Sequence, residues 1–122
     1  MEIIFFKASN GSQPARDFLN SLDSKMRAKL VDQIKYLQEV GHLIRPPRSE
    51  HLQGEIYELR AQSNGNISRI LYFFVIGNKA VLTHGFIKKT QKTPQREIDR
   101  AEEYRKQYLA QQREGLNNYG RP

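Results

Sequence analysis

The residues best suited to chemistry in this sequence are basic side chains that lie on or beside a predicted β-sheet. Arg60 and Arg69 flank one turn, whereas Lys88, Lys89 and Lys92 follow the last predicted strand. A guanidinium group binds a phosphate through two parallel hydrogen bonds, and lysine adds a compact positive charge. A lysine can also transfer a proton when burial or neighbouring positive charge lowers its pKa. A set of this kind can bind a phosphate-bearing ligand.

Arg60 and Arg69 are predicted to be cross-strand neighbours, because positions that flank the turn of an antiparallel hairpin face each other. Two like charges held this close are unfavourable unless an anion joins them. Glu58 lies on the same side of its strand as Arg60, so either its carboxylate or a phosphate can join the pair. Without a phosphate, the same residues form a solvated strand end with a surface ion pair worth about 0–1 kcal/mol. We expect little burial of Arg69, because it lies at a strand end beside a turn.

Other common catalytic and metal-binding patterns do not occur in the sequence. There is no cysteine, and His42, His51 and His84 are not spaced with one another or with carboxylates as metal ligands are. There is also no glycine-rich phosphate loop and no serine in a nucleophile-elbow context. The sequence thus predicts neither a metal ion nor another cofactor.

The overall charge agrees with a polyanionic partner. The chain has 122 residues, enough for one domain, with 20 Lys and Arg against 13 Asp and Glu and a formal net charge of +7. Such a charge favours nucleic acid or an acidic protein, although many small soluble proteins are basic without such a partner. We expect a cytoplasmic protein that does not enter a membrane, because no run of about 18 apolar residues and no signal peptide is present.

The sheet that positions the basic groups is predicted from apolar and β-branched segments separated by turns. Strands are expected at 3–6, 54–60, 67–76 and 79–86. The last three are joined by turns that contain glycine and asparagine, which are the strongest local signal for a hairpin. The basic segment that follows then leads out of the sheet.

Apolar residues at helical spacing predict three helices. The first begins near Pro14, the second is capped by Asp23 and ends at Gly41, and the third begins at Pro94 with Thr93 as its N-cap. The predicted fold is α+β, with about four mostly antiparallel strands, an N-terminal helical hairpin on one face and a C-terminal helix. Residues 1–113 are expected to form a single domain, and residues 114–122 a disordered tail.

Three segments together resemble the RelE/HigB superfamily of toxins, and within it the phage-derived HigB-like branch. They are residues 51–60 with an LxGxxYELR-like strand, residues 68–72 with an RILY-like strand, and residues 84–94 with a GFxKKTxKTP-like segment. Each motif alone is weak, but the three stand in order and at separations that are specific for the family. With the opening strand and the first two helices, the resemblance covers roughly residues 1 to 112.

The resemblance implies the toxin of a type II toxin–antitoxin system that inhibits translation as a ribosome-dependent mRNA endonuclease. In such toxins the 2′-hydroxyl of the RNA is the nucleophile, so no metal is required. The protein orients the sugar and phosphate, moves protons and stabilises the developing charge. The implied partners are the ribosome, mRNA and a helix-turn-helix, HigA-like antitoxin encoded next to the toxin.

Carried over to this sequence, the resemblance implies catalytic roles for Arg69, Arg60, Lys88 and Lys89. Arg69 matches the arginine expected to hold the scissile phosphate, and the lysines occupy the segment where relatives place acid–base and phosphate-binding groups. Substrate-binding roles are implied for Lys92, Glu58, His84 and His51. His84 lies in a mostly apolar strand, where a structural histidine with hydrogen-bond partners is the alternative to a catalytic one.

The chain departs from the family pattern after the basic segment. Some members end in a tyrosine or histidine that stacks on the base or transfers a proton, whereas here a long helix follows. Tyr104 and Tyr108 on that helix are predicted to pack in the core, which leaves the general base open. Two other functions remain: a ParE-like DNA gyrase poison, which shares the fold, and a non-catalytic basic module that binds nucleic acid.

Overall fold

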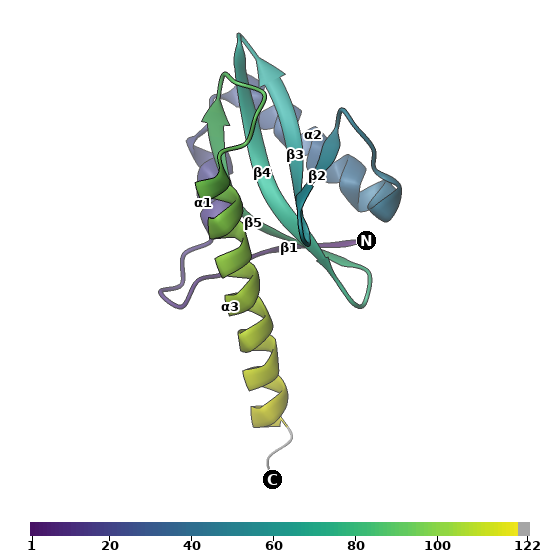
Figure 1. Cartoon of the computed structure of the whole chain (residues 1–122), viewed down its shortest axis with the longest axis vertical. Coiled ribbons are helices and arrows are strands. Elements are labelled where there is room, and N and C mark those ends of the chain that lie inside the picture. The colour runs from purple at the N-terminus through teal and green to yellow at the C-terminus, as the bar shows by residue number, and fades with distance from the viewer. Residues whose placement is uncertain (120–122) are drawn as a thin grey trace.

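The computed structural model describes the chain through Tyr119, with side chains through Gly115, and has one sheet between two helical layers (Figure 1). The strands are β1 (Glu2–Phe5), β2 (Ser49–Gln53), β3 (Ile56–Ser63), β4 (Asn66–Val75) and β5 (Lys79–Lys88). The helices are α1 (Pro14–Ser21), α2 (Ser24–Val40), a short 3-10 helix η1 (Gly41–Leu43), and α3 (Gln95–Tyr119). No described helix is long and apolar enough to cross a membrane.

The sheet has five strands in the order β1-β5-β4-β3-β2 and is mixed. The pairs from β2 to β5 are antiparallel, whereas β1 pairs with β5 in parallel. The expectation of about four mostly antiparallel strands therefore fits only in part. Sequence analysis missed β2 because its residues, Ser-Glu-His-Leu-Gln, include no β-branched or aromatic side chain. Charged and polar side chains are common on an edge strand, where they disfavour pairing with another chain.

The two helical layers bury opposite faces of the sheet (Figure 1). α1 lies over β5 and α2 over β3, so each helix packs more on the sheet than on its neighbour, and the predicted helical hairpin also fits only in part. Their core includes Leu30 and Leu37 of α2. On the other face, α3 packs Ile98, Ala101 and Tyr108 against the sheet, which confirms the expected packing role of Tyr108.

Local signals set most of the helix ends. Asp23 accepts a hydrogen bond of 2.9 Å from the amide of Met26, and Gly41 ends α2 with a φ of +57°, as predicted. α3 begins after Pro94, one residue later than predicted, because the carbonyl of Pro94 accepts its first amides. At the other end, the tail expected from residue 114 overlaps α3, which is helical through Tyr119; residues 120–122 lie outside the described residues.

Candidate functional site

A carboxylate joins two arginines on the face of the sheet that carries α3. Arg60 of β3 pairs with Arg69 of β4 in the antiparallel register, so both side chains point to this face. Glu58 lies on the same face, diagonally across from Arg69. Its Oε2 accepts a hydrogen bond of 2.5 Å from Arg60 Nε, and its Oε1 lies 3.2 Å from Arg69 Nε. The predicted arginine pair and the carboxylate that links it are both confirmed.

The expectation that Arg69 lies at a solvated strand end is wrong. The side chains of Arg69 and Glu58 are 0% exposed, and that of Arg60 is 16% exposed. Arg69 Nε makes no hydrogen bond, so its contact with Glu58 is an ion pair only. Burial lowers the pKa of Arg69, Glu58 opposes this shift and Arg60 adds to it, but an arginine remains protonated. The cluster is therefore a buried set of charges and not a surface ion pair.

The arginines are buried because residues 88–93, here called the basic loop, fold back over this end of the sheet. Arg69 donates to two carbonyl oxygens of the loop, and Arg60 donates to a third and to a glutamine side chain. The acceptors are Lys88 O at 3.4 Å and Thr90 O for Arg69, and Gln91 O and Gln91 Oε1 at 3.2 Å for Arg60. At the end of the loop, the buried hydroxyl of Thr93 donates to Glu58 Oε1. The path of the loop is thus fixed by the charged cluster.

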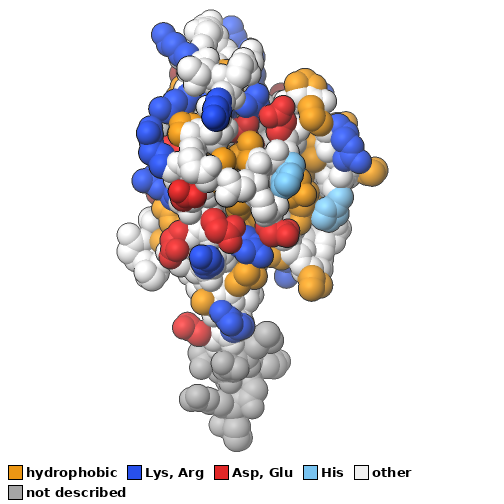
Figure 2. Space-filling view, viewed as in Figure 1, with side chains coloured by type: hydrophobic (Ala, Val, Ile, Leu, Met, Phe, Trp, Pro, Cys, Tyr) orange, Lys and Arg blue, Asp and Glu red, His pale blue; other side chains and the backbone are white. Residues whose placement is uncertain are grey.

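The lysines of the basic loop face outward from this cluster. Lys89 and Lys92 are exposed, and Lys88 is half-buried at the end of β5. Figure 2 shows that on the α3 face, Lys and Arg side chains gather along the upper left of the view, while carboxylates lie below them. A surface of this kind can bind phosphate groups and stabilise negative charge, since its cations are supported on a fixed backbone.

His84 lies on the same face but farther along β5. It is four residues before Lys88, which corresponds to roughly 13 Å along an extended strand. The side chain is 5% exposed, with Nε2 at 3.1 Å from Glu97 Oε1 and Nδ1 at 3.1 Å from Thr83 Oγ1. Burial lowers its pKa, and the hydrogen bond and charge of Glu97 oppose this shift. His84 therefore has the surroundings expected of a structural histidine, which is buried and has hydrogen-bond partners.

His51 is on the opposite face of the sheet from the two arginines. It pairs with Tyr57 across β2 and β3, the two rings lie 5.0 Å apart, and Tyr57 packs with the core under α1 and α2. Its Nε2 lies 2.6 Å from the carbonyl oxygen of Gly54. The structure therefore does not bring His51 to the cluster that contains Arg60 and Arg69.

Sequence analysis missed three members of the site. Thr93 was assigned as a helix cap, yet its hydroxyl bonds Glu58, and Gln91 was not considered although it accepts from Arg60. Glu50 of β2 lies 3.9 Å from Arg60, in a strand that was not predicted. Gln91 and Thr93 lie in the basic segment that the sequence analysis singled out, whereas Glu50 lies outside every segment that it singled out. Among the described residues, no group of three His, Asp or Glu side chains is placed to hold a metal ion.

A family model matches most of the chain. The family model described as "Phage derived protein Gp49-like (DUF891)" matches residues 17–106, which include α2, all strands except β1, the charged cluster and the basic loop. Among curated proteins, none matches the chain. The matched region therefore contains every side chain of the cluster described above.

Proposed function

The chain belongs to the phage-derived Gp49-like family of type II toxins, which is related to the RelE-like toxins, and we propose that it cleaves mRNA on the ribosome. The family suggests a toxin–antitoxin toxin with an antitoxin as partner. The observation that supports the cleavage activity is the basic loop fixed on buried charges. Such a loop carries its three lysines on a backbone held by hydrogen bonds, and positive charge placed in advance is how a site stabilises charge that develops only in a transition state.

In the proposed reaction, the 2′-oxygen of the RNA attacks the adjacent phosphorus and the bond to the 5′-oxygen breaks. The products are a 2′,3′-cyclic phosphate and a 5′-hydroxyl. One group must accept the proton of the 2′-hydroxyl, and another must donate a proton to the departing oxygen. Negative charge grows on the non-bridging oxygens, and Lys88, Lys89 and Lys92 are the groups proposed to contact the RNA there.

The two arginines have different roles in this proposal. Arg60 is partly exposed at the edge of the basic loop, so its guanidinium is the one proposed to reach a substrate phosphate. Arg69 is fully buried and donates to the loop backbone, so we assign it as a positioning residue that acts through the loop. Glu58 has the same positioning role, because it holds both arginines and Thr93.

Single-turnover cleavage of mRNA on programmed ribosomes tests the proposal. The variant Lys88→Ala/Lys89→Ala/Lys92→Ala should cleave more slowly by on the order of 10²-fold or more, the scale of losing preorganised charge stabilisation. A matched control replaces Lys25, Lys35 and Lys106, which are exposed elsewhere, with alanine. The control loses the same net charge and should cleave within about 3-fold of the wild-type rate.

Three results would contradict the proposal. If the folded wild-type chain does not cleave mRNA on programmed ribosomes, the proposed activity is rejected. An equal loss of cleavage rate in both triple variants would show that the loop lysines act only through the net charge of the protein. Growth arrest with intact mRNA and broken chromosomes would favour a gyrase poison over an endonuclease.

A further inference from the structure

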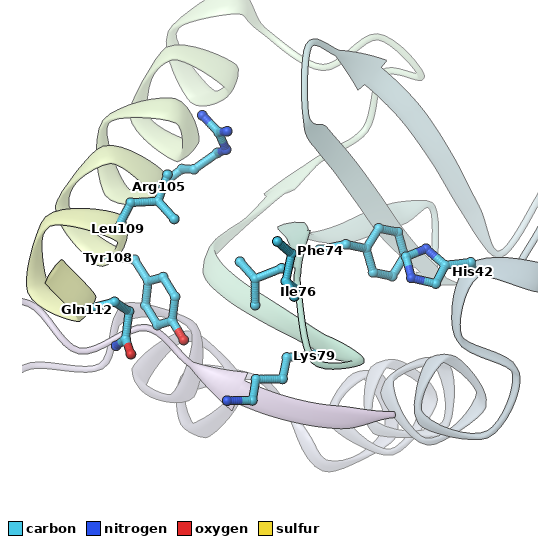
Figure 3. Close-up of a pocket in the computed structure, with 9 residues that line it drawn as sticks. His42, Phe74, Ile76, Lys79, Arg105, Tyr108, Leu109 and Gln112 are labelled. Carbon is cyan, nitrogen blue, oxygen red and sulfur yellow. The ribbon is translucent and has the colours of Figure 1, made fainter. Parts of the chain in front are cut away.

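An apolar groove lies at the end of the sheet away from the basic loop. It runs between the second half of α3 and the β4–β5 hairpin and has a volume of about 770 Å³. Figure 3 shows Arg105, Tyr108 and Leu109 of α3 on one side and Phe74, Ile76 and Lys79 on the other. Nearly the whole of β4 separates the groove from the basic loop, roughly 25 Å along an extended strand. The two surfaces are therefore separate.

Two of the four exposed large apolar side chains in the described part of the chain line this groove. Ile76, which is fully exposed, and Leu109, which is 36% exposed, line it. Leu43 is 72% exposed and follows His42, whose ring lies 4.0 Å from that of Phe74. Exposed apolar side chains that cluster in a hollow, and do not scatter singly over the surface, are typical of a surface that binds another protein.

The spacing on α3 indicates a helical occupant. Arg105, Tyr108, Leu109 and Gln112 are the α3 residues that line the groove, at positions i, i+3, i+4 and i+7 of the helix. This spacing forms one stripe along a helix, the arrangement that packs against a second helix laid beside it. An amphipathic helix with apolar residues at the same spacing can fill the groove with side chains, as in other helix-in-groove complexes.

The charges around the groove indicate an acidic occupant. Lys79 lines the groove, and none of the described lining residues is acidic. One carboxylate lies nearby, because Glu2 of β1 pairs with Lys79 in the parallel register and its charge acts on Tyr108. Arg105 also lines it, although its Nη1 is paired at 2.9 Å with Glu102 on the same helix. Lys79, beside Glu2, is the lining cation for which no side-chain ion pair is formed among the described residues, and the net charge of +7 adds attraction for an acidic partner at longer range.

We infer that the groove binds an acidic amphipathic helix of a partner protein, with apolar residues against Ile76 and Leu109 and a carboxylate near Lys79. Within the proposed toxin–antitoxin pair this partner is the antitoxin, an identification that rests on the proposed function. A helix bound here leaves the basic loop uncovered. It inhibits a ribosome-directed toxin by added bulk, because the enlarged complex no longer fits where the toxin alone does.

Synthetic peptides provide the probe. One fluorescein-labelled 20-residue helical peptide carries leucines at i, i+3, i+4 and i+7 with flanking glutamates, and a second has lysine at every glutamate position. Fluorescence anisotropy with the full chain should show that the glutamate peptide binds at least ~10-fold more tightly than the lysine peptide. A scrambled glutamate peptide, with the same charge and no apolar stripe, should bind at least ~10-fold more weakly.

Variants then locate the binding site. Ile76→Ser/Leu109→Ser should weaken binding of the glutamate peptide by ~10-fold or more, and Lys79→Ala by about 3-fold. Ile87→Ser is the matched control, since Ile87 is another exposed apolar residue, 45% exposed, in β5 away from the groove. The variant in which the three lysines of the basic loop are alanine should still bind the peptide. Peptide binding thus tests the groove, whereas RNA cleavage separately tests the proposed function.

The inference is overturned by any of three results. Equal binding of the glutamate and lysine peptides would remove the charge argument, and unchanged binding by Ile76→Ser/Leu109→Ser would place the peptide elsewhere. Sedimentation that shows a dimer of the wild-type chain and a monomer of Ile76→Asp would assign the groove to a second copy of this chain.

Discussion

The two ends of β4 contrast in what they bury. At one end Arg69, a charged residue, is completely buried, while just beyond the other end Ile76, an apolar residue, is completely exposed. Arg69 is buried because a carboxylate and loop carbonyls replace the water that its guanidinium loses. Ile76 is exposed because it lies in the turn that follows β4, where no described element covers it. Burial here depends on which groups the neighbours supply and not on the hydrophobicity of the residue alone.

The largest effect is expected at the buried end. Glu58→Ala should lower the free energy of unfolding by about 3–5 kcal/mol, because it leaves the charge of Arg69 buried without a carboxylate. Urea unfolding followed by circular dichroism measures this change. Glu50→Ala is the matched control, since Glu50 also lies near Arg60, at 3.9 Å, but is 44% exposed. The control should change stability by less than about 1 kcal/mol. If both variants had equal stability, the buried cluster would not be what holds this end together.

A second effect should appear in the basic loop. Arg69→Ala should lower the free energy of unfolding by about 2–3 kcal/mol, less than Glu58→Ala, because Glu58 keeps its hydrogen bond from Arg60. Loss of two contacts to loop carbonyls should also free the loop, so trypsin should cut after its lysines about 10-fold faster. Arg48→Ala, which removes an exposed arginine bonded to Gln33, is the control for both measurements. Unchanged proteolysis in Arg69→Ala would mean that the loop holds its path without this arginine.

A smaller and pH-dependent effect is expected between the two ends, at His84. Burial lowers its pKa below the ordinary value of 6.5, against the opposing effect of Glu97 and with a further lowering by Arg100. The unfolded chain then binds more protons than the folded one below about pH 6.5, so acid should destabilise the protein there. Between pH 7 and 5, thermal unfolding should show a larger loss of stability for the wild type than for His84→Gln. The opposite sign would show that the hydrogen bond with Glu97 outweighs burial.

The smallest effect on stability is expected at the exposed end. Ile76→Ser should change the free energy of unfolding by no more than about 0.5 kcal/mol, because the side chain buries nothing that unfolding would expose. Urea unfolding beside Val81→Ser, which removes a fully buried side chain of β5, gives the contrast. A large loss in Ile76→Ser would mean that Ile76 contributes to folding, and the contrast between the two ends of β4 would disappear.

Sequence analysis was most successful where the determining contacts are local. The β3–β4 turn places Arg60 opposite Arg69, and strand alternation adds Glu58, so this part of the site follows from spacing alone. The path of the basic loop over the sheet does not follow from spacing, because it depends on hydrogen bonds that join these three residues to Thr90, Gln91 and Thr93. Those contacts join segments that are distant in the chain, and no periodic pattern marks them.

For the sheet and the groove too, features set by local contacts were predicted and features set by distant contacts were not. The hairpin strands were predicted from β-branched runs and turns, whereas the parallel pairing of β1 with β5 and the edge strand β2 were not, since both require partners far along the chain. The groove was also absent from the prediction. Apolar periodicity on α3 indicates a buried face, but the sheet is too short to cover Leu109 in the second half of the helix.

By itself, then, the sequence determined the three helices, the central hairpins, the excess positive charge and the placement of two arginines and a carboxylate on one face of the sheet. Each of these follows from residue types within a few positions, because turns, caps and strand alternation act locally. The tertiary structure alone decided that the arginines are buried beneath the basic loop, that His51 lies on the opposite face, and that Ile76 and Leu109 border an open groove. These features depend on which distant segments meet, and that is settled by packing the two helical layers onto a sheet of limited length.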